Sequence, residues 1–181
     1  MKRNKYLQHT WVDPRIIAKF SPIHGKGLFA SNKIKRGEVI MIWGGEVIKK
    51  SGYNENMYRE LTVVPISEDS YLGLPVSDQS ESLDEYLNHS CDPTAWLTDE
   101  VTVAARRDIV KGTEITVDFA TWEDDQQYSY ADGNICLCKS KYCRKILSNR
   151  SWMDPELQIR YKSHFTPFLE KRIQKLKNKK G

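Results

Sequence analysis

The four cysteines of this chain are spaced like the ligands of a single metal ion. Three of them form a Cys-x-Cys-x4-Cys cluster at Cys136, Cys138 and Cys143, and the fourth is Cys91. A tetrahedral structural zinc takes four ligands, so the cluster lacks one thiol and the chain contains one more. The alternative is that the thiols are buried apolar side chains without a metal. The ligand count favours a structural zinc site.

Cys91 stands in the middle of a polar hexapeptide, Asn88 to Pro93, whose residue types suit ligand binding. Asn88 and His89 offer amide and imidazole hydrogen bonds, and the proline favours an extended backbone at the residue before it. The same six residues also fit a polar turn between two strands. By itself the hexapeptide leaves a binding site and a turn equally open.

A second candidate for ligand contact is Gly25-Lys26-Gly27. Two glycines allow a tight turn and let the backbone approach a ligand closely. The stretch lacks the third glycine of a dinucleotide fingerprint and the lysine spacing of a phosphate loop. Taken alone, it is a weak indication of a binding loop.

The elements that must position these residues belong to a chain of ordinary globular composition. Its 181 residues are 39% hydrophobic and 29% charged, which suits one core with small appendages. No apolar run is long enough for a signal peptide or a membrane span. We therefore expect a cytoplasmic or nuclear protein without membrane contact, in which cysteines remain thiols or metal ligands.

The net charge of +4 arises largely from a basic tail over residues 171–180. A basic tail can contact nucleic acid or another acidic partner, but no aromatic residues interleave with these lysines. A solvated helix end is the simpler interpretation. Direct binding of nucleic acid is therefore disfavoured.

Short β-branched runs separated by turns dominate the first two-thirds of the chain. We expect strands over residues 15–20, 39–43, 63–66, 71–76 and 114–119, and a hairpin from residues 95–98 and 101–105. Residues 49–62 are predicted to be a helix or loop of marginal stability. Because no β-α-β alternation is present, a doubly wound nucleotide-binding sheet is disfavoured.

The end of the chain has a helical pattern. Asp154-Pro155 and Thr166-Pro167 are typical helix starts, and each is followed by apolar residues on one face. We expect two amphipathic helices that pack on the strand-rich body or on a partner. A homo-oligomer through these helices is one such arrangement.

Three segments together resemble the SET-domain protein-lysine methyltransferases. They are residues 25–48, residues 87–93 and residues 107–119, and residues 136–147 are similar to the post-SET zinc segment of that family. The compact size and helical ending resemble the small stand-alone members. On this basis we expect an N-terminal arm over 1–13, a SET domain over 14–122, a post-SET zinc segment over 123–147 and a helical extension over 148–181.

The resemblance implies a mainly β fold with some α structure. Small curved sheets are expected, with a C-terminal segment threaded beneath a preceding loop and helices at the C-terminus. This crossing would bring Asn88 and His89 beside the strand that ends at Phe119. Sequence periodicity alone does not predict it.

The resemblance also implies S-adenosylmethionine-dependent methylation of a lysine side chain in a protein or peptide substrate, such as a histone. The residues that match the family's cofactor-binding positions are Lys26, Gly27, Trp43 in place of a tyrosine, Asn88, His89 and Leu147. Cys91, Cys136, Cys138 and Cys143 match its structural zinc ligands, which agrees with the ligand count.

Two positions match the family's catalytic residues. Tyr71 resembles the channel tyrosine that orients the substrate amine, although an ordinary strand aromatic is the alternative. Phe119 replaces the usual catalytic tyrosine. Losing one oriented hydroxyl costs about 1–3 kcal/mol, or roughly 10- to 100-fold in rate.

The replacement at Phe119 leaves a second function open, a catalytically weak SET-fold binding module that acts through protein partners. Tyr128 and Tyr130 are candidates for a substitute hydroxyl, but nothing in the sequence places either one at the site. Val117, where the family varies between aromatic residues, is expected to leave a roomier channel for lysine that is already methylated.

Overall fold

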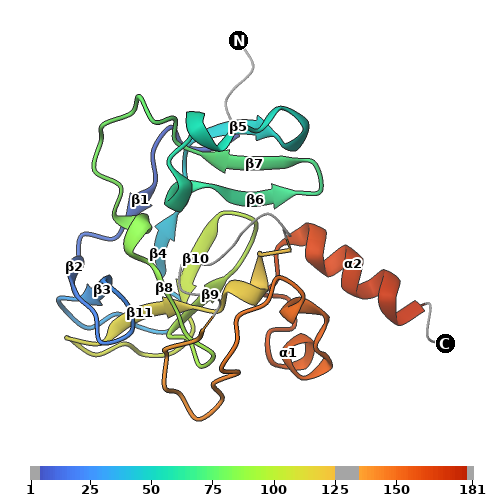
Figure 1. Ribbon diagram of the computed structural model, residues 1–181. Helices are drawn as coiled ribbons and strands as arrows, with labels where there is room; N and C mark the ends of the chain where they lie inside the picture. The colour runs from blue at the N-terminus through green and yellow to red at the C-terminus, as the bar shows by residue number, and fades with distance from the viewer. Residues whose placement is uncertain (1–4, 125–134, 179–181) are drawn as a thin grey trace.

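The computed structural model describes residues 5–124 and 135–178, and three small sheets carry most of its regular structure (Figure 1). The first sheet has the order β1 (Trp11–Val12), β4 (Val39–Ile42), β10 (Thr102–Ala105), β9 (Ala95–Leu97). The second has the order β2 (Ile16–Phe20), β3 (Lys26–Ala30), β11 (Glu114–Val117), β8 (Asn88–His89). The third has the order β5 (Glu46–Lys49), β7 (Ser70–Gly73), β6 (Val64–Ser67). The mainly β fold expected from the sequence is confirmed.

The sequence patterns missed several strands, β1, β3 and β8 among them. β3 begins inside the Gly25-Lys26-Gly27 stretch, whose glycines favour a tight turn, and it pairs with β2 on one side and with β11 on the other. β1 lies in the expected peripheral arm, yet it pairs with β4. Two-residue strands, and a strand with glycine as its second residue, show too little alternation to be recognised.

Residues 49–62 form three short 3-10 turns, Lys50–Gly52, Glu55–Met57 and Glu60–Thr62, after the end of β5. Asn54 caps the second turn, because its side chain accepts a hydrogen bond from the backbone N–H of Asn56. Further 3-10 turns lie at Leu83–Tyr86, Phe119–Thr121 and Ser151–Met153.

The parallel pairing of β8 with β11 is the feature that builds the site. Asn88 lies opposite Thr116 and His89 opposite Val117, and the backbone N–H of Ser90 donates to the carbonyl of Val117 at 2.9 Å. Asn88 and His89 therefore lie beside the strand that leads into Phe119, as the resemblance implied.

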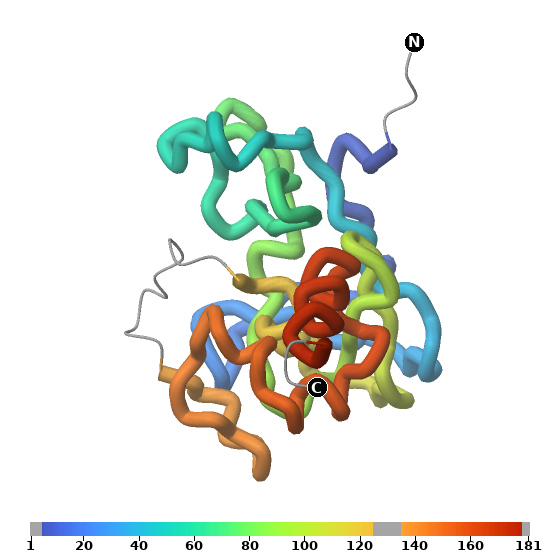
Figure 2. Tube along the Cα trace, turned by 90° about the vertical axis from the view of Figure 1, so that its right-hand side faces the viewer, coloured from blue at the N-terminus to red at the C-terminus, as the bar shows by residue number. Residues whose placement is uncertain are grey.

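Two helices, α1 (Pro155–Arg160) and α2 (Pro167–Asn178), lie on one side of the sheets (Figure 1). In the view from that side, they lie in front of the sheets (Figure 2). Asp154 caps α1 through the backbone N–H of Glu156 at 2.8 Å. The apolar faces of both helices share one core with the turn after β11, made by Ala120, Trp152, Leu157, Tyr161, Phe165, Phe168, Leu169 and Ile173. The helices thus pack on the body, one of the two arrangements expected. No helix among the described residues is long and apolar enough to cross a membrane.

Candidate functional site

A pocket of about 490 Å³ lies beside the β8–β11 pair. This volume is within the range of small-molecule sites in proteins. Its lining comes from segments far apart in sequence: residues 23–26, Trp43, residues 60–61 and 63–65, Tyr71, residues 84–89, Phe119, residues 122–123, residues 135–137 and Leu147. The fold therefore brings most of the residues predicted as site residues around one cavity.

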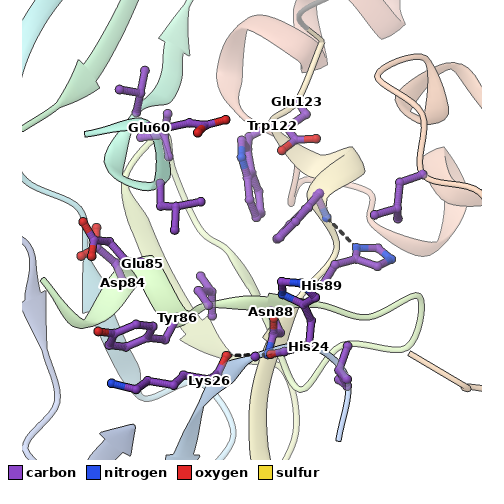
Figure 3. A pocket seen from close by; sticks show the side chains of 18 of the residues that line it. His24, Lys26, Glu60, Asp84, Glu85, Tyr86, Asn88, His89, Trp122 and Glu123 are labelled. Carbon is purple, nitrogen blue, oxygen red and sulfur yellow. Dashed lines mark hydrogen bonds between the residues drawn. The ribbon is translucent and has the colours of Figure 1, made fainter. Parts of the chain in front are cut away.

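The pocket has two chemically different ends (Figure 3). His24, Lys26 and Asn88 lie at one end, while Trp122 and Glu123 lie at the other, facing Glu60. The first end carries a cation and amide groups. The second combines aromatic rings with carboxyl groups, which suits a positively charged ligand group.

Asn88 fixes the loop that forms the first end. Its Nδ2 lies 3.1 Å from the carbonyl oxygen of His24, 3.0 Å from that of Lys26 and 2.8 Å from Oε1 of Glu114. Asn88, which is predicted to bind the cofactor, therefore also holds neighbouring segments together through hydrogen bonds. Its two amide protons are shared among three acceptors on neighbouring segments.

Gly27 is predicted to contact the cofactor, but its place in the structure assigns it a packing role as well. A Cβ atom at this position would lie 2.2 Å from Oε1 of Glu114 and 2.9 Å from Cβ of Ser21. Only glycine lets Glu114 approach β3 closely enough to meet Asn88. Lys26 lines the pocket, and its Nζ lies 4.9 Å from the ring centre of Tyr86.

His89 connects the pocket to the cysteines. Its Nδ1 accepts a hydrogen bond from the backbone N–H of Phe119 at 3.2 Å, which leaves the ring proton on Nε2, 3.3 Å from Sγ of Cys91. Burial lowers the pKa of His89 to about 4, so the imidazole is neutral near pH 7. A neutral ring can accept and donate at once, as this bridge requires.

Aromatic rings form one wall of the pocket. The ring centres of Phe119 and Trp122 are 5.1 Å apart, those of Trp43 and Trp122 are 5.2 Å apart, and that of Phe119 is 5.2 Å from the centre of His89. Tyr71 also lines the cavity, with only 6% of its surface exposed and the Nζ of Lys50 4.8 Å from its ring centre. The two tyrosines weighed as substitutes for a hydroxyl at Phe119, Tyr128 and Tyr130, lie outside the described residues.

The four cysteine sulfurs lie within 4.8 Å of one another. Four thiolates at a Zn–S distance of about 2.3 Å in a tetrahedron have sulfurs about 3.8 Å apart, and the Sγ atoms of Cys91 and Cys136 are 3.8 Å apart. Burial raises the pKa of the Cys91 thiol to about 11. A dication would reverse that shift, so the donor set fits zinc.

Leu147 packs against Cys91 and Cys136 and also lines the pocket. The cysteine cluster is therefore adjacent to the pocket, and Leu147 lies between them.

Arg144 was not identified from the sequence. Its guanidinium group donates two hydrogen bonds of 2.7 Å to the carboxylate of Asp118, directly before Phe119. Burial opposes ionisation of this carboxyl group, but Arg144 outweighs it and holds the pKa of Asp118 below its usual value. The contact depends on folding, and the one sequence signal that could have indicated it is the position of Arg144 directly after Cys143.

Glu123 was also missed. Its backbone N–H donates to the carbonyl of Phe119 at 2.9 Å, so it follows that residue by one turn. The residue as a whole is partly exposed, but its Oε2 is shielded from solvent and has no hydrogen-bond partner among residues 5–124 and 135–178. Burial, with repulsion from Asp118, raises the pKa of this carboxyl group well above its ordinary value of 4.5.

We expect Glu123→Gln to become increasingly stabilising relative to the wild type as the pH rises. Above about pH 4.5 the unfolded chain releases the Glu123 proton while the folded chain retains it, so the wild type loses up to about 1.4 kcal/mol per pH unit until the folded pKa is passed. Glutamine carries no such proton. Denaturant unfolding of both proteins at about pH 5 and about pH 8 measures the effect, and a pH-independent difference would contradict it.

Comparison with known proteins identifies the family. A family model described as SET domain matches residues 25–120, more than half of the chain. Histone-lysine N-methyltransferase set1 of Dictyostelium discoideum is 31% identical over 148 residues, which are 74% of this chain and 9% of that protein. Histone-lysine N-methyltransferase trithorax of Drosophila virilis is 29% identical over 140 residues, 71% of this chain and 3% of that protein. The chain therefore spans less than a tenth of either relative.

A solved structure of KRYPTONITE in complex with mCHH DNA, H3(1-15) peptide and SAH has a similar fold, with a TM-score of 0.54 and 20% sequence identity. The similarity covers 74% of this chain and 29% of that one. The small sheets and the β8–β11 pair agree with the family match over residues 25–120, and the chain belongs to the SET-domain family.

Proposed function

We propose that this chain transfers a methyl group from S-adenosylmethionine to the side-chain amine of a lysine in a protein or peptide, and that histones are among its substrates. The observation that carries the proposal is the convergence of Tyr71, His89, Phe119 and Trp122 on one pocket, next to a four-thiol cluster. The names of the relatives support the same reaction and the histone substrate.

The pocket residues suit a cofactor with polar and apolar parts. Lys26, Asn88 and His89 would contact its polar groups, while Trp43 and Leu147 would cover its apolar surface. When bound, S-adenosylmethionine supplies an electrophilic methyl group. Gly27 would contribute to the cofactor site by shaping the loop at Lys26.

The chain's own contribution is positioning. Methyl transfer to an amine is an in-line displacement that needs a neutral amine, a dry channel and a fixed approach, and no nucleophile on the enzyme. The rings of Phe119 and Trp122 would exclude water, and Tyr71 would orient the amine with its hydroxyl group. Zinc at Cys91, Cys136, Cys138 and Cys143 would be structural and would hold the segment at Leu147 against the pocket.

A catalytically weak binding module is the second candidate, because Phe119 carries no hydroxyl group. Such a protein would retain the cofactor or a peptide and act through partners. The expected domain divisions, a cytoplasmic or nuclear location, the absence of direct nucleic-acid binding and the homo-oligomer through α1 and α2 remain predictions. The wider substrate channel expected from Val117 also remains a prediction.

We expect the wild type to label histones or proteins of a cell lysate from radiolabelled S-adenosylmethionine, and Phe119→Tyr to label them roughly 10- to 100-fold faster. The tyrosine would restore a hydroxyl group at the pocket. Phe20→Tyr is a matched control, because Phe20 is 88% exposed and lies outside the pocket lining. Labelling by Phe119→Tyr alone would identify the wild type as the binding module.

A further inference from the structure

Among residues 5–124 and 135–178, the Oε2 atom of Glu123 is a shielded carboxyl oxygen without a hydrogen-bond partner, on a residue that lines the pocket. Buried carboxyl oxygens are almost always hydrogen-bonded, because a lost partner costs the group its desolvation energy. The Oε2 of Glu123 is buried and lacks a partner among the described residues, although Glu123 lines the cavity. A carboxyl group with an unsatisfied oxygen, on a residue that lines the cavity, suits hydrogen bonding to a ligand group.

The surroundings specify the charge of that group. Glu123 lies beside Trp122 and across from Glu60, at the end of the pocket opposite Lys26 (Figure 3). Ionised carboxyl groups and the faces of aromatic rings both attract cations and would repel an anion, and a protonated carboxyl group can still hydrogen-bond to an amine nitrogen. An alkylammonium group, such as that of a lysine side chain, fits this end.

We propose that the carboxyl group of Glu123 binds the amine of the substrate lysine and takes up its proton, at the site where Phe119 offers no hydroxyl group. The inference rests on the proposed lysine methylation and names a residue that would contact the substrate. It also explains why an acidic side chain lies one turn after Phe119 with its Oε2 unbonded within the described part of the chain.

The proton balance of the step is complete. An ammonium group that meets the Glu123 carboxylate gives its proton to the carboxylate, which leaves a neutral amine and a carboxylic acid. A neutral amine that enters beside the protonated carboxyl group reaches the same state. The lone pair of the amine nitrogen then forms the N–CH₃ bond while the S–CH₃ bond of the sulfonium breaks, which yields a methylammonium group and a thioether.

The test measures amine binding separately from turnover. n-Butylamine, a mimic of the lysine side chain, is titrated into the protein saturated with S-adenosylhomocysteine, and binding is followed by tryptophan fluorescence, since Trp43 and Trp122 line the pocket. We expect Glu123→Gln to weaken n-butylamine binding about 10- to 100-fold. Its affinity for S-adenosylhomocysteine should remain within about twofold of wild type, which also shows that the variant is folded.

Glu46→Gln is the matched control, because Glu46 is an exposed glutamate on β5 outside the pocket lining. It should bind both ligands like the wild type. Equal n-butylamine affinity in wild type and Glu123→Gln, or no binding by the wild type, would overturn the role of Glu123.

Methyl transfer is then measured on the same proteins, so that the inference and the proposed function fail in different ways. Amine binding that depends on Glu123, without transfer by the wild type, would refute only the enzymatic function. Transfer by Glu123→Gln at the wild-type rate would refute only the inference.

Discussion

Replacing Cys91 with alanine is expected to remove the metal and to detach residues 135–147 from the pocket. The four sulfurs lie within 4.8 Å of one another, and Cys91 is the only one from outside the segment 136–143. Structural zinc sites bind with apparent free energies of about 10–16 kcal/mol, whereas a whole domain is stable by only about 5–15 kcal/mol. Loss of this ligand should therefore remove a large part of the folding free energy.

Elemental analysis and thermal unfolding check the expectation. The purified wild type should contain about one zinc per chain, and Cys91→Ala much less, with a lower midpoint of unfolding. Lys141→Ala is a suitable control, because Lys141 is exposed in the same segment and is not a ligand. A wild type that is folded without metal would refute the zinc site.

The sequence predicted this cysteine cluster for a simple reason. Thiols in a Cys-x-Cys-x4-Cys spacing are unusual as packing residues, and a ligand count needs no knowledge of the fold. The same applies to the longer strands, such as β4 and β10, whose β-branched runs are visible locally. These are properties of one segment at a time.

The pairing of β8 with β11 could not be derived in that way. β8 contains two residues, Asn88 and His89, too few for any periodicity, and its partner lies more than twenty residues further along the chain. The family resemblance supplied it. Glu123 and Arg144 were missed for a related reason, because their roles arise from burial and from contacts that form only after the segments meet.

Arg144→Met is expected to destabilise the protein by about 3–5 kcal/mol. The change removes both hydrogen bonds from the guanidinium group to Asp118, whose side chain has no exposed surface. A buried carboxylate without its cation is strongly unfavourable, and the pair also ties the cysteine segment to the strand end before Phe119. Denaturant unfolding measures the loss, and Arg150→Met, at an exposed arginine nearby, should have little effect.

A double-mutant cycle separates the ion pair from simple packing. Asp118→Asn removes the charge that Arg144 neutralises, so Arg144→Met should cost much less in that background than in the wild type. The backbone N–H of Ala120 that donates to Asp118 at 3.1 Å can still donate to the asparagine oxygen. Additive losses would mean that the methylene groups of Arg144, and not its charge, hold the two segments together. A coupling of at least about 1 kcal/mol would instead identify the pair as the electrostatic link between the four-thiol site and the pocket.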